Sequence, residues 1–285
     1  MGCCQSRYSK PRMGKLIWLA SYPKSGNTWL RAFLHNYILG AREPHSINRL
    51  VDMSVAECAM AFFGPPGEVL SPAEVQARRP RVHAELTRLH EDLVFVKTHN
   101  ARLSLHGVPL CTPEVTAGAI YVVRDPRDVA LSYAAFTGKS VDEIIDFMGQ
   151  EGAANASDGV QVFELLSSWS AHALSWVAAP RRLLVRYEDL LAEPERYFAR
   201  IIRFLGREGE RPEPELLRRA IAFSSFATLS GQETREGYRA AGPGRERFFR
   251  QGKAGGWRDK LTAAQARALW SAHGPVMEKF GYPPV

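Results

Sequence analysis

The residues best placed to do chemistry lie in a short segment near the N-terminus, YPKSGNT at positions 22–28. Gly26 permits a sharp turn of the main chain, and Lys24 supplies a full positive charge. The apolar run LIWLAS before the segment predicts a strand, and WLRAFLHNYI after it predicts a helix. The amides at the start of that helix would point at whatever lies above the turn, which suits a phosphate or sulfate group. The alternative is an ordinary strand–turn–helix with a surface Lys.

The order of these residues differs from the Walker pattern G-x-x-x-x-G-K-[ST]. Lys24 precedes Gly26 rather than following it, and no second Gly lies five residues upstream. The segment therefore predicts a phosphate loop of a different kind.

A second candidate is His99, one of eight histidines, which directly follows an apolar strand pattern. A lone His is more often a structural hydrogen-bonding residue, but His at the end of a buried strand suits a general base, because its unperturbed pKa of ~6.5 is close to working pH. Five other histidines fall in predicted helices or in a polar insertion, namely His35, His172, His273, His83 and His90.

Two arginines follow a further strand pattern in the segment RDPRD. Arg124 lies nearest the strand end, where its planar fork could hold a phosphate through two hydrogen bonds. For Arg127 we favour a salt bridge with Asp125 or Asp128.

Four short apolar runs predict the buried strands of a parallel sheet. Because parallel strands need crossover connections, we expect one α/β domain of the phosphate-loop nucleotide-binding type, with helices on both faces of a central parallel sheet. The predicted strands are Leu16–Ser21, Leu93–Lys97, Ala119–Val123 and Leu183–Arg186. After the first helix, the predicted helices are Pro126–Ala135, Val141–Met148, Phe163–Ala178, Pro194–Leu205, Pro214–Ala222 and Thr262–Phe280.

Other segments fit this pattern less well. Ser54–Phe63 and Pro72–His90 have irregular helical patterning, broken by Gly and Pro, and predict an insertion that could cover a pocket. Ser230–Gly256 is rich in Gly and Arg and predicts a long irregular segment.

Ligands of open α/β sheets bind outside the carboxyl ends of the strands. Lys24, His99, Arg124 and Tyr187 each come at or just after the end of a predicted strand. We therefore expect these side chains to meet at one edge of the sheet, where they would suit a phosphorylated ligand with a proton transfer beside it.

The composition is that of a soluble enzyme-sized domain, with 285 residues, 45% hydrophobic content and a net charge of +7. The charge fits an anionic small ligand, nucleic acid or an anionic membrane surface. The basic residues are scattered and no nucleic-acid module is recognisable, so we expect no nucleic-acid partner. Four cysteines without zinc spacing indicate a reducing compartment, and we expect a cytoplasmic protein.

The N-terminus MGCCQS fits an N-myristoylation pattern followed by two cysteines that could be palmitoylated. Met13-Gly14 could instead start the translated protein, and the composition, rich in Ala and Arg, is typical of a GC-rich bacterial source. We favour this alternative, without membrane contact. Residues 1–13 are then expected to be a disordered extension and 14–285 the domain.

Six motifs, in this order, resemble those of the sulfotransferases that use 3′-phosphoadenosine-5′-phosphosulfate (PAPS). YPKSGNTW is similar to the 5′-phosphosulfate loop, VKTH to the segment with the catalytic His, and YVVRDPRDVALSY to the 3′-phosphate motif. RYEDL, SSF and FRQGKAGGW are similar to later cofactor-binding segments. The likeness covers residues 16 to about 261, and the style of the first motif is closest to bacterial small-molecule members.

The resemblance implies a role for each matching residue. His99 would deprotonate the acceptor, and Lys24 would contact the bridging and terminal oxygens of the phosphosulfate. The amides of Ser25, Gly26, Asn27 and Thr28 would bind the 5′-phosphate. The adenine pocket would consist of Trp29, Tyr187, Ser224 and Phe226, and the 3′-phosphate site of Arg124, Ser132, Arg250 and the Gly252 backbone. Trp29 and Phe226 could alternatively be ordinary core residues.

The chain departs from the family pattern at three positions. Asn27 replaces a Thr but keeps hydrogen-bonding capacity. Gln251 replaces a Lys beside Arg250, which removes one charge near the 3′-phosphate. Gly256 replaces the usual Asp before Trp257, and the sequence offers no interpretation of that change.

From the resemblance we expect sulfuryl transfer from PAPS to a hydroxyl, or an amine, of a small organic acceptor. A natural product could be such an acceptor. No metal is expected, because Lys24 and the loop amides already stabilise the leaving group. An ATP-dependent small-molecule kinase on the same fold is the rival enzyme, and a lipid-anchored adaptor is the non-enzymatic one. The acceptor and the oligomeric state are open.

Overall fold

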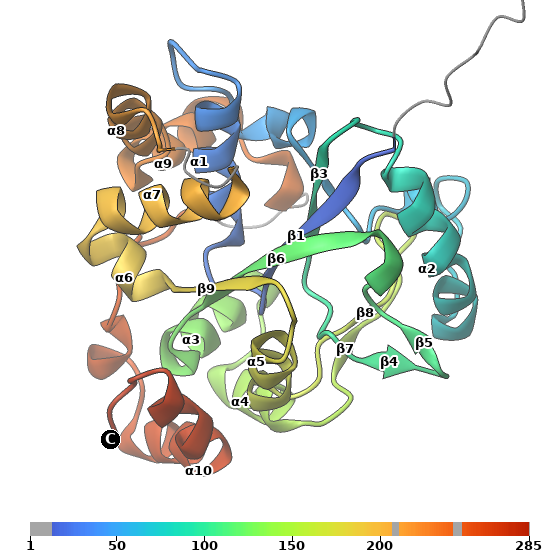
Figure 1. The fold of residues 1–285 in the computed structure, drawn as a ribbon. Coiled ribbons are helices and arrows are strands. Elements are labelled where there is room, and N and C mark those ends of the chain that lie inside the picture. Colours follow the sequence, from blue (N-terminus) through green and yellow to red (C-terminus); the bar gives the residue numbers. More distant parts are fainter. Residues whose placement is uncertain (1–12, 207–210, 242–246, 285) are drawn as a thin grey trace, which may run out of the picture.

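A five-stranded parallel sheet forms the centre of the computed structural model, which describes residues 13–206, 211–241 and 247–284 (Figure 1). The strand order is β2-β3-β1-β6-β9, and each neighbouring pair is parallel. The strands are β1 (Lys15–Ser21), β2 (Ser54–Ala56), β3 (Leu93–Thr98), β6 (Thr116–Val123) and β9 (Arg182–Arg186). The predicted fold class, one α/β domain around a central parallel sheet, is confirmed.

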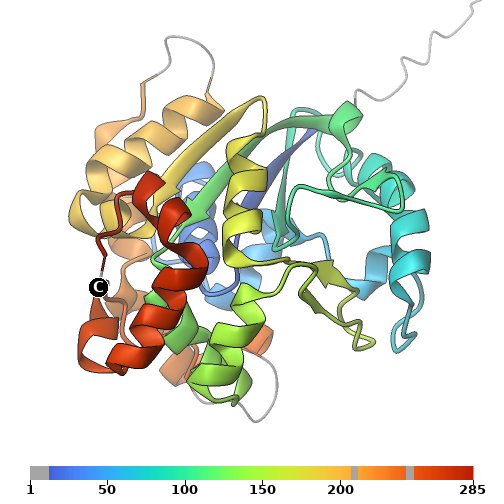
Figure 2. The ribbon, with the colours of Figure 1, turned by 90° about the horizontal axis from the view of Figure 1, so that it is seen from below.

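Hydrophobic layers cover both faces of this sheet because successive side chains of a strand point to opposite sides. In β1, Leu16 and Trp18 belong to one buried cluster, and Ile17 and Leu19 belong to the other. Figures 1 and 2 show α1, α7 and α8 on one side of the sheet, and α3, α4, α5 and α10 on the other. The strand residues therefore read as continuous apolar runs in the sequence.

Ten α-helices lie in the described part of the chain. Several start at a side-chain cap with Glu or Gln three residues later, as at Ser71, Ser140 and Thr262. The helices are α1 (Asn27–Ile38), α2 (Pro72–Leu86), α3 (Pro126–Thr137), α4 (Val141–Gly149), α5 (Trp169–Val177), α6 (Tyr187–Ala192), α7 (Pro194–Leu205), α8 (Pro214–Phe223), α9 (Phe226–Glu236) and α10 (Ala263–Lys279).

Short elements complete the described structure. Two antiparallel ribbons pair β4 (Ser104–Leu105) with β5 (Val108–Pro109), and β7 (Ala154–Asn155) with β8 (Glu164–Leu165). The 3₁₀ helices are Ile47–Asp52, Met60–Phe62, Pro113–Val115, Arg239–Ala241 and Gly256–Asp259.

The prediction that the helix labelled α5 starts at Phe163 is wrong. Glu164 and Leu165 belong to β8, and the Leu165 amide donates to the Asn100 side chain over 2.8 Å. The helix starts only after Ser168, whose hydroxyl accepts a hydrogen bond from the Ala171 amide. Tertiary pairing thus overrides a helical pattern in this segment.

The insertion predicted over residues 54–90 is in fact part of the core. Ser54–Ala56 is an edge strand rather than irregular helix, and it pairs with β3. Val75 and Val82 of α2 are buried in one of the two main clusters. The segment therefore extends the sheet and contributes to its core.

The segment Ser230–Gly256 is less irregular than predicted, because α9 continues to Glu236. Residues 242–246 lie outside the described residues, as does the possible acylation motif at Gly2, Cys3 and Cys4. Among the helices that the structure describes, none combines the length and the apolar character that crossing a membrane requires.

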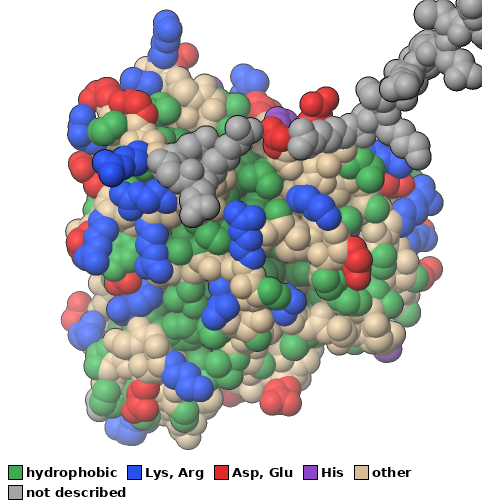
Figure 3. Space-filling view, in the orientation of Figure 1, with side chains coloured by type: hydrophobic (Ala, Val, Ile, Leu, Met, Phe, Trp, Pro, Cys, Tyr) green, Lys and Arg blue, Asp and Glu red, His purple; other side chains and the backbone are tan. Residues whose placement is uncertain are grey.

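Charged side chains are dispersed over the face in Figure 3. Lys and Arg side chains lie at many separate points there, with acidic, hydrophobic and other side chains between them. Within the described residues on this face, the basic groups form no single continuous strip.

Candidate functional site

The turn between β1 and α1 has the backbone of an anion-binding loop. Lys24 and Gly26 both have positive φ angles, 65° and 105°, and Gly26 is the N-cap of α1. A Cβ at Gly26 would lie 2.7 Å from Tyr187 Cδ2, so a larger residue is excluded by packing as well as by backbone conformation. The amides of the first turn of α1 have no acceptor within their own helix, and they can donate to an anion.

The side chain of Asn27 joins this loop to the end of β1. Its side-chain nitrogen donates to the Leu19 carbonyl oxygen over 2.8 Å and to Ser21 Oγ over 3.3 Å. The hydrogen-bonding capacity expected at this position is thus directed at the end of β1. Ser25 Oγ and Asn27 Oδ1 are buried without a hydrogen-bond partner among the described residues.

His99 lies directly after β3 and is held through three of its groups. Its ring Nδ1 donates to the Ser21 carbonyl oxygen over 2.8 Å, and its amide donates to Glu164 Oε1 over 3.0 Å. Its carbonyl oxygen accepts a hydrogen bond from His172 Nε2 over 3.0 Å, and Tyr121 donates to His172 Nδ1 over 2.9 Å. Because Nδ1 carries the proton, Nε2 of His99 keeps its lone pair.

The His99 ring is neutral at physiological pH. Burial, followed by the charge of Lys97, lowers the pKa of His99 to about 3. A half-buried imidazole that is neutral and fixed in one tautomer can accept a proton at Nε2.

Glu164 is a functional candidate that the sequence did not reveal. One of its oxygens accepts the His99 amide and lies 3.4 Å from Lys97 Nζ. Burial alone would raise the pKa of Glu164, but the Lys97 ammonium and His99 lower it to about 2. The carboxylate is therefore ionised and fixes both residues. It lies in β8, a two-residue strand without a recognisable sequence signal.

Lys24 extends toward two aromatic rings. Its Nζ lies 4.3 Å from the centroid of the Phe136 ring and 3.5 Å from that of Phe248. The faces of aromatic rings attract cations, so these two rings help to hold the ammonium near the loop.

Arg124 connects three distant parts of the chain. Its Nη1 donates to the Lys24 carbonyl oxygen over 3.1 Å, and its Nη2 donates to the Lys253 carbonyl oxygen over 3.0 Å. Its guanidinium lies 4.3 Å from the centroid of the Tyr187 ring. Its Nε is buried and has no hydrogen-bond partner within the described segments. Arg124 thus retains donors for an anion between the loop and the C-terminal segment.

The C-terminal segment is attached to the first turn of α3. Asp128 accepts the Gly255 amide over 2.6 Å and the Trp257 amide over 3.0 Å. The predicted salt bridge of Arg127 is confirmed, with 2.8 Å between its Nη2 and Asp125 Oδ2. These contacts bring the segment that contains Arg250 and Gly252 to the edge of the sheet.

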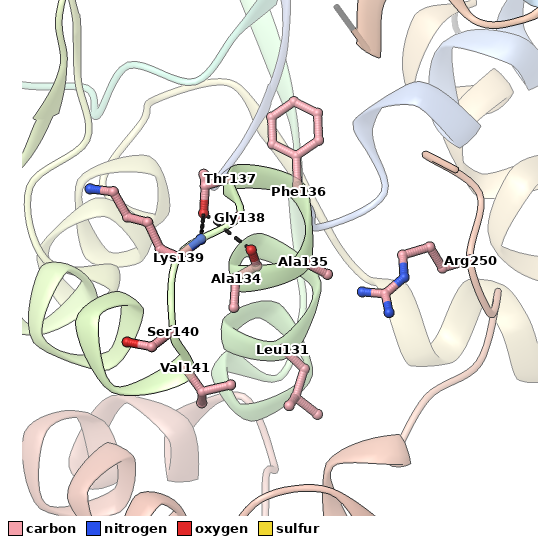
Figure 4. A pocket seen from close by; sticks show the side chains of 10 residues that line it. All are labelled: Leu131, Ala134, Ala135, Phe136, Thr137, Gly138, Lys139, Ser140, Val141 and Arg250. Carbon is pink, nitrogen blue, oxygen red and sulfur yellow. Dashed lines mark hydrogen bonds between the residues drawn. The ribbon is translucent and has the colours of Figure 1, made fainter. Parts of the chain in front are cut away.

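Arg250 faces a hollow beside α3. The hollow has a volume of about 730 Å³ and is lined by Arg250 and by residues between Leu131 and Val141. In Figure 4 the Arg250 side chain extends toward α3. Ser132 is half-buried on α3.

Among the predicted adenine residues, Trp29 and Tyr187 contact each other. Trp29 packs edge-on against Tyr187, with 5.6 Å between ring centroids, and its Nε1 has no partner among the described residues. A Cβ at Gly252 would lie 2.3 Å from the Phe226 ring, so that glycine lets the segment pass close to Phe226. Phe226 is 37% exposed, whereas Trp29 is half-buried and packs against two of the core clusters. Ser224 is buried and donates to the Ala220 carbonyl oxygen.

Comparison with known proteins identifies the family. The model of the sulfotransferase domain family matches residues 15–281. A 3-beta-hydroxysteroid sulfotransferase of Cavia porcellus is 25% identical over 280 residues, covering 93% of this chain and 83% of that protein. Cytosolic sulfotransferase 16 of Arabidopsis thaliana is 27% identical over 284 residues, covering 92% of this chain and 75% of that protein.

Two solved structures have the same fold. A mouse sulfotransferase, SULT7A1, complexed with PAP superposes with a TM-score of 0.57 and 19% identity, covering 92% of this chain and 84% of that one. Retinol dehydratase in a complex with retinol and PAP gives a TM-score of 0.60 and 18% identity, covering 95% and 82%. Since the family model spans nearly the whole chain, the protein belongs to the sulfotransferase domain family, the PAPS-dependent enzymes that its motifs resemble.

Proposed function

We propose that this enzyme transfers the sulfuryl group of PAPS to a hydroxyl, or an amine, of a small organic acceptor. The observation that carries the proposal is the arrangement of His99, which is neutral and held through Nδ1, its amide and its carbonyl oxygen. Its Nε2 retains a lone pair beside an anion-binding loop that begins where Ser21 ends β1. A proton acceptor and a site for a phosphate leaving group are thus adjacent.

The residues present fit the proposed donor. Arg124 Nε, Ser25 Oγ and Trp29 Nε1 are buried polar groups that lack a partner among the described residues, and a ligand with phosphate groups and a heteroaromatic base could pair with such groups. We assign the 5′-phosphosulfate to Lys24 and the amides of residues 25–28. The 3′-phosphate is assigned to Arg124, Ser132, Arg250 and the Gly252 backbone, and adenine to Trp29, Tyr187, Ser224 and Phe226.

With a hydroxyl acceptor, the reaction forms one S–O bond to the acceptor and breaks the S–O bond to the 5′-phosphate. PAPS supplies the sulfuryl group and leaves as PAP, the 3′,5′-bisphosphate. His99 Nε2 takes the proton of the acceptor hydroxyl as its oxygen bonds to sulfur. Lys24 Nζ and the loop amides stabilise the negative charge that develops on the departing phosphate oxygen. His172 and Glu164 hold the backbone of His99 in place and contact neither substrate.

This mechanism requires no metal, because Lys24, Arg124 and backbone amides supply the positive charge. In the described residues, no group of three or more His, Cys, Asp or Glu side chains is arranged to hold a metal ion. A cytoplasmic location and a bacterial source are further proposals, which rest on the cysteine pattern and on the style of the first motif.

Two of the compared proteins carry hydroxyl compounds in their names, a 3-beta-hydroxysteroid for one and retinol for the other. For this chain we propose only the shared chemistry, a hydroxyl on a small organic molecule. Sulfur-labelled PAPS should be incubated with phenols, alcohols and glycosides, and both labelled product and released PAP should be measured. Equal amounts of product and PAP are expected without Mg²⁺. Transfer from ATP that depends on Mg²⁺ would instead establish the kinase.

A further inference from the structure

Arg31, in the second turn of α1, is bound to neutral partners. Its Nε donates to Ser54 Oγ over 2.7 Å, and its Nη2 donates to the Ser54 carbonyl oxygen over 2.9 Å. Both partners belong to β2, the edge strand of the sheet. Within the described residues no carboxylate pairs with Arg31, although the side chain is half-buried.

Burying a guanidinium against neutral partners alone costs desolvation free energy unless an anion also binds to it. Desolvation disfavours a cation without an opposite charge, and burial lowers the pKa of Arg31. This chain neutralises two other buried arginines directly, Arg79 with Glu57 and Arg127 with Asp125. A guanidinium has five N–H donors, and the two bonds to Ser54 leave both Nη1 donors and one Nη2 donor. These lie on the edge of the fork that can hold a carboxylate bidentately.

Arg31 is also connected to the reacting groups through the sheet. Its partner Ser54 is paired with Phe95 of β3, and Lys97 lies two residues further along that strand. Lys97 is paired with Glu164, which holds His99. Ala32, the next residue of α1, belongs to a buried cluster against which Tyr238 packs.

Tyr238 links this part of α1 to Lys24. Its ring lies 5.0 Å from that of Phe248, which in turn contacts Lys24 Nζ at 3.5 Å. The surroundings of Arg31 are therefore connected to His99 through β2 and β3, and to Lys24 through Tyr238 and Phe248. Lys24, Arg31, Lys97 and His99 are each half-buried, so solvent reaches all four residues.

We propose that Arg31 binds a carboxylate on the acceptor, so that the preferred acceptors are hydroxy acids. This inference rests on the proposed sulfuryl transfer at His99. One monoanionic carboxylate balances the single charge of Arg31, and bidentate hydrogen bonds would orient the acceptor hydroxyl toward His99 Nε2. Arg31 is then a residue that selects and positions the acceptor, and it takes no part in proton transfer.

The test compares 3-(4-hydroxyphenyl)propionate and 6-hydroxyhexanoate with their methyl esters. Binding of each to the enzyme preloaded with PAP is measured by calorimetry, and kcat/KM is measured with PAPS. In the wild type each acid should exceed its ester at least ~10-fold in affinity and in kcat/KM, which corresponds to about 1.4 kcal/mol. Arg31→Met should abolish this preference and leave the ester within about twofold of its wild-type value, as expected when one charge-assisted contact is lost.

Arg49→Met is the matched control. Arg49 lies in the 3₁₀ helix Ile47–Asp52, just before β2, but its exposed side chain pairs with Asp52. The acid preference should survive in this variant. The inference is overturned if acids and esters are used equally, if only the esters are used, or if Arg31→Met weakens both alike, which would reflect the lost bonds to Ser54. PAP binding and transfer to the esters report separately on the proposed function.

Discussion

Replacing Arg124 with Ala should remove most of the selectivity of the enzyme for a 3′-phosphate. The guanidinium is fixed by the Lys24 and Lys253 carbonyl oxygens, at 3.1 and 3.0 Å, and its Nε is buried without a partner among the described residues. The side chain is therefore pre-organised, and an anion that reaches it need not order a flexible side chain first. PAP has a phosphate for this position, whereas 5′-AMP has none.

The size of the effect follows from the donors involved. A hydrogen bond to a charged group contributes roughly 1.5–3 kcal/mol, and Arg124, Ser132 and Arg250 are the side chains proposed for this phosphate. Because such contributions are not additive, we expect PAP to bind at least ~100-fold more tightly than 5′-AMP, equivalent to about 2.7 kcal/mol. Arg124→Ala should reduce the ratio to below about tenfold, mainly by weakening PAP.

Calorimetric titration of both nucleotides into wild type and variant measures this ratio directly. Arg186→Lys is a suitable control, since Arg186 also ends a strand of the sheet but pairs with Asp189 and contacts the Tyr282 ring. Its ratio should match the wild type. Equal affinity of the wild type for PAP and 5′-AMP, or an unchanged ratio in Arg124→Ala, would refute the assignment of the 3′-phosphate site.

The other predictions concern catalysis, charge and pH. His99→Ala should lower kcat by about 10²–10⁴-fold with PAP affinity nearly unchanged, and wild-type turnover in the folded variant would exclude His99 as the base. Lys24→Met should lower kcat more than it weakens PAP binding, whereas a loss of affinity alone would make Lys24 a binding residue. Gln251→Lys should raise the ratio of PAP to 5′-AMP affinity by restoring a positive charge, which the same titration would detect. Denaturant unfolding should show a lower free energy of unfolding at pH 5 than at pH 7. The reason is that several buried histidines are neutral in the native state and bind protons with a pKa near ~6.5 once unfolded. A free energy of unfolding that stays flat or rises toward pH 5 would contradict this. Their pKa values are lowered to about 4 for His35, about 3 for His99, about 4 for His172 and about 4 for His273, chiefly by burial.

The functional residues at the carboxyl ends of the strands could be predicted because each is marked by its position in the local sequence. Lys24, His99, Arg124 and Tyr187 each come at or after the end of an apolar run, and parallel strands bring such ends together without further information. Arg124 contacts both the Lys24 carbonyl and the Tyr187 ring, as this rule requires. The four longer strands and most helices follow from apolar runs and caps in the same way.

The residues that hold His99 could not be predicted, because their positions depend on tertiary contacts. Glu164 lies in a strand of two residues within a segment of helical pattern, and its partner is 65 residues away. His172 was assigned to a helix, correctly, but nothing local indicates that its Nε2 reaches the His99 carbonyl oxygen. The edge strand β2 was missed for a similar reason, since three residues are too few to show a periodic pattern.

The two departures at positions 251 and 256 lie close together in the structure. A Cβ at Gly256 would lie 3.3 Å from Gln251 Oε1 and 3.8 Å from Asp128 Oδ1. An Asp at position 256 would therefore bring a carboxylate toward Asp128, and a cation at position 251 would be the natural group to offset that repulsion. With Gln at position 251 the cation is absent, and Gly at position 256 removes the carboxylate that would need it. The structure thus places the two departures next to each other and next to Asp128. Asp128 consequently remains free to hold the Gly255 and Trp257 amides and, through them, the segment that contains Arg250.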